Sequence, residues 1–206
     1  MTSIDTDTPT AGPATSSPVV EGMLRRRSVA ALVAPGPTQA QLDAILRSAT
    51  TVPDHGNLRP YRFVVVSGDA RPRFGDALVS ALESLRGEVD PAVRDKVRSK
   101  AFVAPTLIAL VSSPNVRAKI DRWEQVATAS CCGFAMVLAA HSMGIGAMWK
   151  STPFQRGGDL DTVLGLGPDE QLLGWVNLGQ PADPAALADP RPDLDPARFT
   201  SVLPAG

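Results

Sequence analysis

Apolar residues recur along this chain in patterns that predict helices alternating with short strands. The most apolar stretch runs from Val126 to Ala140 and is broken only by Thr128, Ser130 and Gly133. Because apolar side chains then lie on every face of a helix, the pattern predicts a helix that is buried all round. The stretch is too short to cross a bilayer, which needs about 20 predominantly apolar residues. Its many small residues would let another backbone approach closely, so a subunit interface is a compatible, sharper interpretation.

Shorter helices are predicted from apolar spacing and from capping residues. Thr38 and Gln41 form a capping-box pattern, which marks a helix N-terminus. Asp69 opens a further helix and Gly87 follows its end, with Phe74, Leu78, Leu82 and Leu85 as the expected buried stripe. The predicted helical ranges are 19–27, 38–52, 69–86, 90–100 and 160–164.

Strands are predicted at 61–66, 105–112, 171–179 and near Met148-Trp149. The range 105–112 is almost entirely apolar, which predicts a central position in the sheet. Gly144-x-Gly146 invites comparison with a dinucleotide-binding loop. That loop follows a strand and opens a helix, whereas here a helix runs into the glycines and a strand follows. The glycines therefore predict a helix C-cap.

Length and composition predict one domain with polar ends. The chain has 206 residues, which is within the usual size of a single domain. Residues 1–18 are rich in Thr, Ser and Pro and predict a disordered leader without the features of a secretory signal. Residues 19–180 form the predicted domain. Residues 181–206 carry six prolines, so they are either disordered or an arm laid over another surface.

Charge and residue counts exclude several function classes. The net charge is −1, so nucleic acid and anionic membranes are not expected partners. With no membrane span and no signal, we expect a cytoplasmic protein. The two histidines and the adjacent Cys131 and Cys132 supply neither a zinc ligand set nor a disulfide framework.

Three polar segments contain candidate binding or catalytic residues. Arg25, Arg26, Arg27 and Ser28 form either a solvated helix end or a phosphate clamp, because guanidinium groups offer a planar fork of donors. Lys150 and Ser151 repeat the same cation and hydroxyl chemistry far away in the sequence. His55 lies in a proline-bounded loop and is either a surface histidine or a functional one.

Taken together, five segments resemble the nitroreductase family of FMN-dependent oxidoreductases, and in particular its small bacterial single-domain members. The order and spacing agree from about residue 20 to residue 181. The segments are Arg26-Arg27-Ser28, PDHGNLRPYRFVVV at 53–66, Arg122-Trp123-Glu124-Gln125, Gly144-x-Gly146 with Trp149-Lys150-Ser151, and Leu178-Gly179-Gln180-Pro181.

The resemblance implies an α+β sandwich in which helices flank a mixed or antiparallel sheet around the long buried helix. It also implies an intertwined homodimer with FMN at the interface and with the 181–206 arm packed on the partner subunit. Arg26, Arg27 and Ser28 would hold the FMN phosphate and ribityl chain. Lys150 and Ser151 would join them, with Trp149 beside them and His55 approaching from the other subunit. No catalytic side chain and no metal ligand are implied.

The function that follows is transfer of a hydride from NADPH or NADH, through flavin N5, to a nitroaromatic, quinone or similar acceptor in a ping-pong cycle. Two alternatives stay open: a non-catalytic flavin-binding protein, and a flavoenzyme with a different reaction on the same fold. The sequence departs from the family pattern at three positions. Tyr61 replaces a Trp, Lys150 replaces an Arg, and Thr51 stands where relatives carry an Arg that contacts the cofactor.

Overall fold

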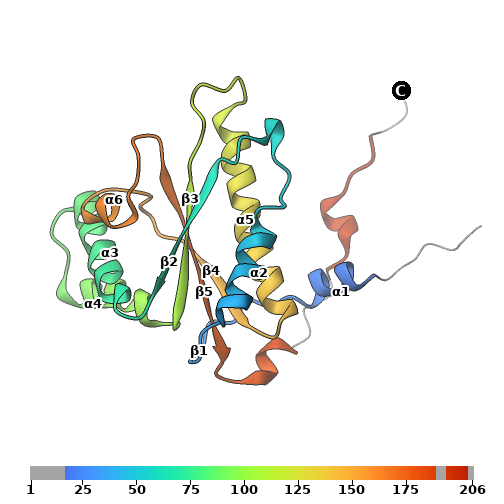
Figure 1. Ribbon diagram of the computed structural model, residues 1–206, viewed down its shortest axis with the longest axis horizontal. Helices are drawn as coiled ribbons and strands as arrows, with labels where there is room; N and C mark the ends of the chain where they lie inside the picture. The colour runs from blue at the N-terminus through green and yellow to red at the C-terminus, as the bar shows by residue number, and fades with distance from the viewer. Residues whose placement is uncertain (1–16, 189–193, 204–206) are drawn as a thin grey trace, which may run out of the picture.

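The computed structural model describes residues 17–188 and 194–203, which contain six helices interspersed with five strands (Figure 1). The helices are α1 Pro18–Arg25, α2 Gln39–Ala49, α3 Ala70–Arg86, α4 Pro91–Ser99, α5 Arg122–Ser142 and α6 Asp159–Leu164. The strands are β1 Leu32–Val33, β2 Tyr61–Ser67, β3 Thr106–Ser112, β4 Gly146–Lys150 and β5 Gln171–Pro181. Short 3-10 turns are η1 His55–Asn57, η2 Lys100–Phe102, η3 Pro184–Leu187 and η4 Pro196–Phe199.

The predicted leader lies almost wholly outside the described residues. Its last two positions belong to the fold, since Ser17 Oγ accepts the Val20 N–H over 3.2 Å and Pro18 is the first residue of α1. The first helix therefore begins one residue before the predicted start at 19, because a Ser N-cap followed by Pro favours the start of a helix.

The strands form one antiparallel sheet. β3 pairs with β2 on one side and with β5 on the other, and all of its residues are buried. β5 also pairs with β4 and, at its far end, with β1. The predicted central position of β3 is confirmed, and every described pairing is antiparallel, so the fold class is α+β.

Helices cover both faces of the sheet (Figure 1). On one face, α3 and α6 pack over Leu107 and Ala109 of β3, with α4 beside them. On the other face, α2 and α5 pack over Ile108 and Leu110. Since successive residues of a strand point to opposite faces, burial on both sides explains why β3 is apolar throughout.

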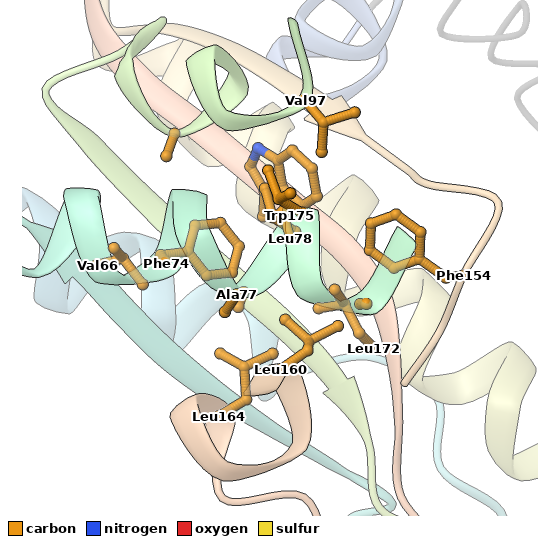
Figure 2. Packing of buried hydrophobic residues seen from close by; sticks show 14 of the residues in the cluster. Val66, Phe74, Ala77, Leu78, Val97, Phe154, Leu160, Leu164, Leu172 and Trp175 are labelled. Atoms are coloured by element: carbon orange, nitrogen blue, oxygen red, sulfur yellow. The ribbon is translucent and has the colours of Figure 1, made fainter. Parts of the chain in front are cut away.

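Two aromatic rings are in contact in the core beneath α3 (Figure 2). Phe74 meets Trp175 edge to face, with ring centroids 5.5 Å apart and planes at 89°. Leu160 and Leu164 of α6 close the cluster on the other side. The predicted stripe of α3 is correct for Phe74, Leu78 and Leu82, whereas Leu85 lies in the last turn of α3 and is exposed.

A bulge in β5 sets which of its side chains face α3. Leu110 pairs with Gly174 and Val111 pairs with Leu172, so Leu173 is an extra residue in β5. Because an added residue reverses the alternation, Leu172 and Trp175 face the same side although they are three positions apart. Gly174 adopts φ 113°, a value that favours glycine.

Two predicted helix ends are confirmed. Thr38 and Gln41 form the complete capping box at the start of α2. At the end of α5 the Gly144 N–H donates to His141 O and the Ile145 N–H donates to Ala140 O. With Gly144 at φ 72°, these two bonds form a Schellman motif, which is a helix C-cap and not a nucleotide-binding loop.

The central helix α5 differs from its prediction in one respect. Its inner face is buried against the sheet and α2 along positions such as Ala129, Cys132 and Met136. The opposite stripe is exposed in the single chain, with Trp123 at 69% and Phe134 at 46%. The prediction of burial on every face is therefore wrong for the single chain. The sheet and α2 cover one side of α5, and no other part of the described chain buries the opposite stripe.

We expect Gly174→Ala to lower the free energy of unfolding by about 3 kcal/mol or more. A Cβ at this position would lie 2.0 Å from Lys150 O, so β4 would have to move away from β5. The matched control is Gly68→Ala, which has φ 52° and open space around its Cβ and should cost only about 1 kcal/mol. Equal midpoints of urea unfolding for the two variants would contradict this role of Gly174.

Candidate functional site

Residues 26–29, which follow α1 and which we call the arginine segment, are fixed against the start of β4. The Val29 N–H donates to Ala147 O over 2.9 Å. Arg26 Nη1 donates to Ser28 Oγ over 3.2 Å. The segment is therefore held beside the sheet.

Arg27 and Ser28 line a cavity of about 530 Å³, which we call the arginine cavity. Its remaining lining residues are Val29, Ala30, Ala31, Ala182, Asp183 and Ala186. The Asp183 carboxylate accepts the Ala185 N–H over 2.9 Å, which caps the turn after β5. A guanidinium and a hydroxyl at the edge of one cavity are groups that bind phosphate.

The positive charges of Arg26 and Arg27 also affect His141 in the last turn of α5. Burial lowers the pKa of His141, and the neighbouring Arg26 and Arg27 lower that pKa further. A neutral imidazole beside two guanidinium groups leaves the positive charge of the arginines available to an anion.

Lys150 and Ser151 line a second cavity, of about 270 Å³, which we call the lysine cavity. Lys100, Val103, Trp175 and Asn177 complete its lining. Burial lowers the pKa of Lys100, and the charges of Lys96 and Lys150 lower it further. Several cations therefore gather at one place where the sequence indicated only a lysine and a hydroxyl.

Buried polar atoms in this region lack a protein partner. Asn177 is 1% exposed, and neither its Oδ1 nor Trp175 Nε1 has a hydrogen-bond partner among the described residues. Burying a polar atom without a partner costs free energy. These two residues, which line the lysine cavity, are therefore positioned to bind a ligand with donors and acceptors of its own.

Strand alternation separates Trp149 from its neighbour Lys150. Lys150 pairs with Trp175, and both line the lysine cavity. Trp149 belongs to the cluster on the α5 face, where a Cβ on Gly133 would lie 2.9 Å from its ring. The structure thus places Trp149 in the packing between β4 and α5, and a contact with a cofactor stays a prediction.

The His55 loop is tied to the beginning of α5. His55 Nδ1 lies 3.0 Å from Glu124 Oε2, and Thr128 Oγ1 donates to Pro53 O. The Asp54 carboxylate accepts the N–H groups of Leu58 and Arg59 over 3.2 and 2.7 Å. The exposed imidazole is therefore presented by a well-defined loop.

The same loop holds two non-glycine residues in the left-handed region, Asn57 at φ 52° and Arg59 at φ 49°. Such conformations cost free energy and cluster at binding sites. Arg59 is exposed next to this strained turn, and no pattern in the sequence singles it out.

The predicted site residues do not meet in one cavity of the single chain. Arg27 and Ser28 line the arginine cavity, whereas Lys150 and Ser151 line the lysine cavity. Ala147, which bonds the arginine segment, and Lys150 are three residues apart on β4, so about 10 Å of strand separates the two contacts.

His55 lies farther away still. It contacts Glu124 in the first turn of α5, whereas the arginines act on His141 in the last turn. The 17 residues from 124 to 141 span about 25 Å of helix. The His55 and Arg27 side chains of one chain are therefore held at opposite ends of α5.

Lys100 is the clearest residue that the sequence interpretation missed. It begins η2 directly after the charged helix α4, where a lysine looks like part of a solvated face. Its place beside Lys150 depends on the sheet pairing of β4 and on the position of α4 over α3. No local pattern reports that contact.

Thr51 lies just after the end of α2. Its Oγ1 donates to Ser48 O over 2.8 Å, and it lines a cavity together with Ala40, Ala44, Arg47 and Ser48. Arg47 precedes Thr51 by one helical turn, so a guanidinium is present on the same surface although position 51 lacks one.

The described ranges, 17–188 and 194–203, hold no group of three or more His, Cys, Asp or Glu side chains that could bind a metal ion. Within the same ranges, no helix combines the length and the apolar character that crossing a membrane requires.

The chain belongs to the Nitroreductase family, whose family-wide pattern matches residues 23–180. This confirms the resemblance that the five segments carried. The chain is 33% identical over 177 residues to the Escherichia coli (strain K12) protein named "Putative NAD(P)H nitroreductase YdjA". The match covers 86% of this chain and 96% of that protein.

Solved structures share the fold. A nitroreductase-like family protein from Bacillus cereus has a TM-score of 0.73 at 20% identity and covers 94% of this chain and 100% of its own. A nitroreductase from Bacteroides fragilis, solved with bound FMN, has a TM-score of 0.67 at 21% identity and covers 92% and 100%. The predicted nitroreductase-like α+β architecture is therefore confirmed.

Proposed function

We propose that this protein is an FMN-dependent oxidoreductase that passes a hydride from NADPH or NADH, through the flavin, to a nitroaromatic, quinone or similar acceptor. The observation that carries the proposal is the pair of cationic cavities beside β4, each with a hydroxyl at its edge. Membership of the Nitroreductase family, the name of YdjA and the FMN bound by the Bacteroides fragilis structure support the choice of cofactor.

The residues of the two cavities fit the two ends of FMN. Arg26, Arg27 and Ser28 would hold the phosphate, since they offer charge-assisted donors. Lys150 and Ser151, with Lys100, would face the ring end. A ribityl chain would bridge the separation along β4, so the two cavities need not merge.

The lysine cavity also fits the electronic demand of the ring. Bound flavin supplies the hydride chemistry, and its reduced ring carries negative charge. Lys100 and Lys150 place positive charge where that negative charge would develop, and the buried Asn177 Oδ1 and Trp175 Nε1 offer an acceptor and a donor. Because the flavin would supply the hydride chemistry and the protein would supply charge and hydrogen bonds, the site would need no acid–base pair of side chains.

A homodimer would complete the site. The exposed stripe of α5 includes Trp123 and Phe134, and α1 exposes Met23 and Leu24. Large exposed apolar residues on adjacent helices favour an interface. The described part of the 181–206 arm exposes further apolar side chains, namely Leu194, Phe199, Val202 and Leu203, which supports packing on the partner subunit.

The dimer also gives His55 a role. Within one chain it is about 25 Å along α5 from the arginines, so it would reach the flavin of the other subunit. Arg59 and Arg47 would approach from the same side of α2 and its following loop.

The function is tested by anaerobic reduction of the purified protein. We expect a yellow protein with FMN absorbance that bleaches on addition of NADPH or NADH and recovers its colour with a quinone. A yellow protein that bleaches with neither nucleotide supports the non-catalytic flavin-binding alternative. A protein that takes up no added FMN would overturn the proposal.

Arg27→Ala should weaken FMN binding about tenfold or more, since a charge-assisted contact to the phosphate would be lost. Riboflavin, which lacks the phosphate, should bind the variant and the original protein alike. Fluorescence titration measures both. Arg73→Ala, an exposed change on α3, is the matched control and should leave both affinities unchanged; an Arg27 variant that keeps full FMN affinity would rule out the phosphate role.

Phe134→Lys should shift the protein from dimer to monomer and reduce its flavin content. A charge at the centre of the exposed α5 stripe would have to be buried in the interface. Sedimentation velocity measures the shift. Leu85→Lys places the same charge at an exposed apolar residue of α3 and should leave the dimer intact, so dissociation of both variants, or of neither, would argue against an α5 interface.

A further inference from the structure

Polar side chains on both sides of Glu124 anchor the first turn of α5. Arg122 Nη2 donates to Asp169 O over 2.8 Å. Gln125 is 4% exposed, and its Nε2 donates to Ile120 O over 2.9 Å. Hydrogen bonds to two separate loops therefore fix this turn, and with it the backbone of Glu124, in the protein without a ligand.

The loop that carries His55 is anchored to the same end of α5 (Figure 1). Pro53 O accepts the Thr128 hydroxyl over 3.2 Å. A Cβ on Gly56 would lie 2.8 Å from Ile120 Cδ1, so the backbone directly after His55 packs closely against the segment that precedes α5. The loop and the helix are therefore each held by contacts other than the one between His55 and α5.

The contact between His55 and Glu124 defines which nitrogen of the imidazole is left for a ligand. His55 Nδ1 lies 3.0 Å from Glu124 Oε2. An ionised carboxylate only accepts hydrogen bonds, so Nδ1 carries a proton in this contact. The His55 side chain is 68% exposed, and no hydrogen bond joins its Nε2 to another residue within 17–188 and 194–203. In the neutral ring, Nε2 is thus an exposed hydrogen-bond acceptor.

The identity of the protonated nitrogen decides which group of a flavin ring the histidine can bind. An oxidised flavin has one ring N–H, which lies between two carbonyl groups. An unprotonated Nε2 accepts from the N–H, whereas a protonated Nε2 donates to a carbonyl. An imidazole that populates both tautomers would present the wrong group in part of the molecules, and selecting one tautomer would then cost binding free energy.

We infer that Glu124 is a positioning residue, which holds His55 as the Nδ1–H tautomer and so presents an Nε2 acceptor to the flavin ring bound with the partner subunit. Glu124 acts through His55 and does not itself contact the cofactor. This inference rests on the proposed function, because the target of His55 is the flavin of the proposed dimer. It also gives residues 122–125 a common purpose, since the side chains on either side of Glu124 fix the carboxylate that sets the tautomer.

Nitrogen NMR of the FMN-loaded protein tests the tautomer without any turnover. The chain has two histidines, so loss of a signal in His55→Ala assigns the spectrum. At about pH 8, where free histidine is neutral, His55 should show a protonated Nδ1 and an unprotonated Nε2. Glu124→Ala should give a mixture of tautomers, whereas Glu124→Gln should keep the original one because its amide oxygen still accepts. A tautomer that does not depend on residue 124 would overturn the inference.

Flavin binding supplies the second measurement, by fluorescence titration. Glu124→Ala should weaken binding of FMN about threefold to tenfold. Riboflavin should lose affinity by the same factor, because Glu124 acts at the ring and not at the phosphate. In a protein that already carries His55→Ala, the same change should have no further effect, since the residue that Glu124 positions is gone. A loss that persists without His55 would show a merely structural role and would overturn the inference.

The matched control is Asp121→Asn. It removes an exposed carboxylate next to the same helical turn, at an N-cap position whose side chain makes no capping bond. Both the His55 tautomer and the FMN affinity should be unchanged in this variant.

The two proposals fail in different ways. A protein that binds FMN and bleaches with NADPH or NADH, but whose Glu124→Ala variant keeps the original tautomer or the original FMN affinity, would overturn the role of Glu124 and leave the oxidoreductase intact. A protein that takes up no FMN would overturn the proposed function, and the role of Glu124 with it, whichever tautomer His55 adopts.

Discussion

The close approach of β4 to β5 at Gly174 is the constraint on which the rest of the site depends. Lys150 O lies where any side chain at position 174 would begin. Gly174 directly follows the extra residue of the β5 bulge, and the bulge places Leu172 and Trp175 on the α3 face. Because Lys150 pairs with Trp175, the same contact brings the lysine to the cavity and not to the α5 face. One glycine thus affects both the packing of a core tryptophan and the position of a lysine that lines a cavity.

Local patterns in the sequence were sufficient where the physics is local. The Thr38 capping box and the Gly144 C-cap involve residues a few positions apart, so the sequence alone identified both. The apolar run of β3 likewise predicted a central strand, because burial on both faces removes the alternation of a half-exposed strand. The prediction that Leu85 is buried was wrong. The spacing of apolar residues along a helix does not show how far the neighbouring structure that covers the helix extends.

The candidate site could be predicted only in part, because its residues come from distant segments. The arginine segment and the Lys150-Ser151 pair were recognisable as cation and hydroxyl pairs, and the structure places each at a cavity. Their separation into two cavities could not be predicted, since it depends on the Val29–Ala147 bond and on the direction of β4. Lys100 could not be identified at all, because an exposed charged helix and a cavity wall have the same local composition. Trp149 looked equally functional in sequence, yet strand alternation turns it toward Gly133 and α5.

The length of α5 and the distribution of charge both indicate that a single chain without a ligand is an incomplete site. The helix holds the His55 loop at one end and the arginine segment at the other, so about 25 Å of helix separates their contacts in a single chain. The exposed apolar stripe of the same helix would give a second chain a surface on which to pack. At the lysine cavity the cations repel one another and buried polar atoms lack partners, which are costs that a folded chain retains only if something else offsets them. A flavin with an anionic reduced state would offset both costs at once, because it would supply hydrogen-bond partners inside the cavity and negative charge beside the lysines.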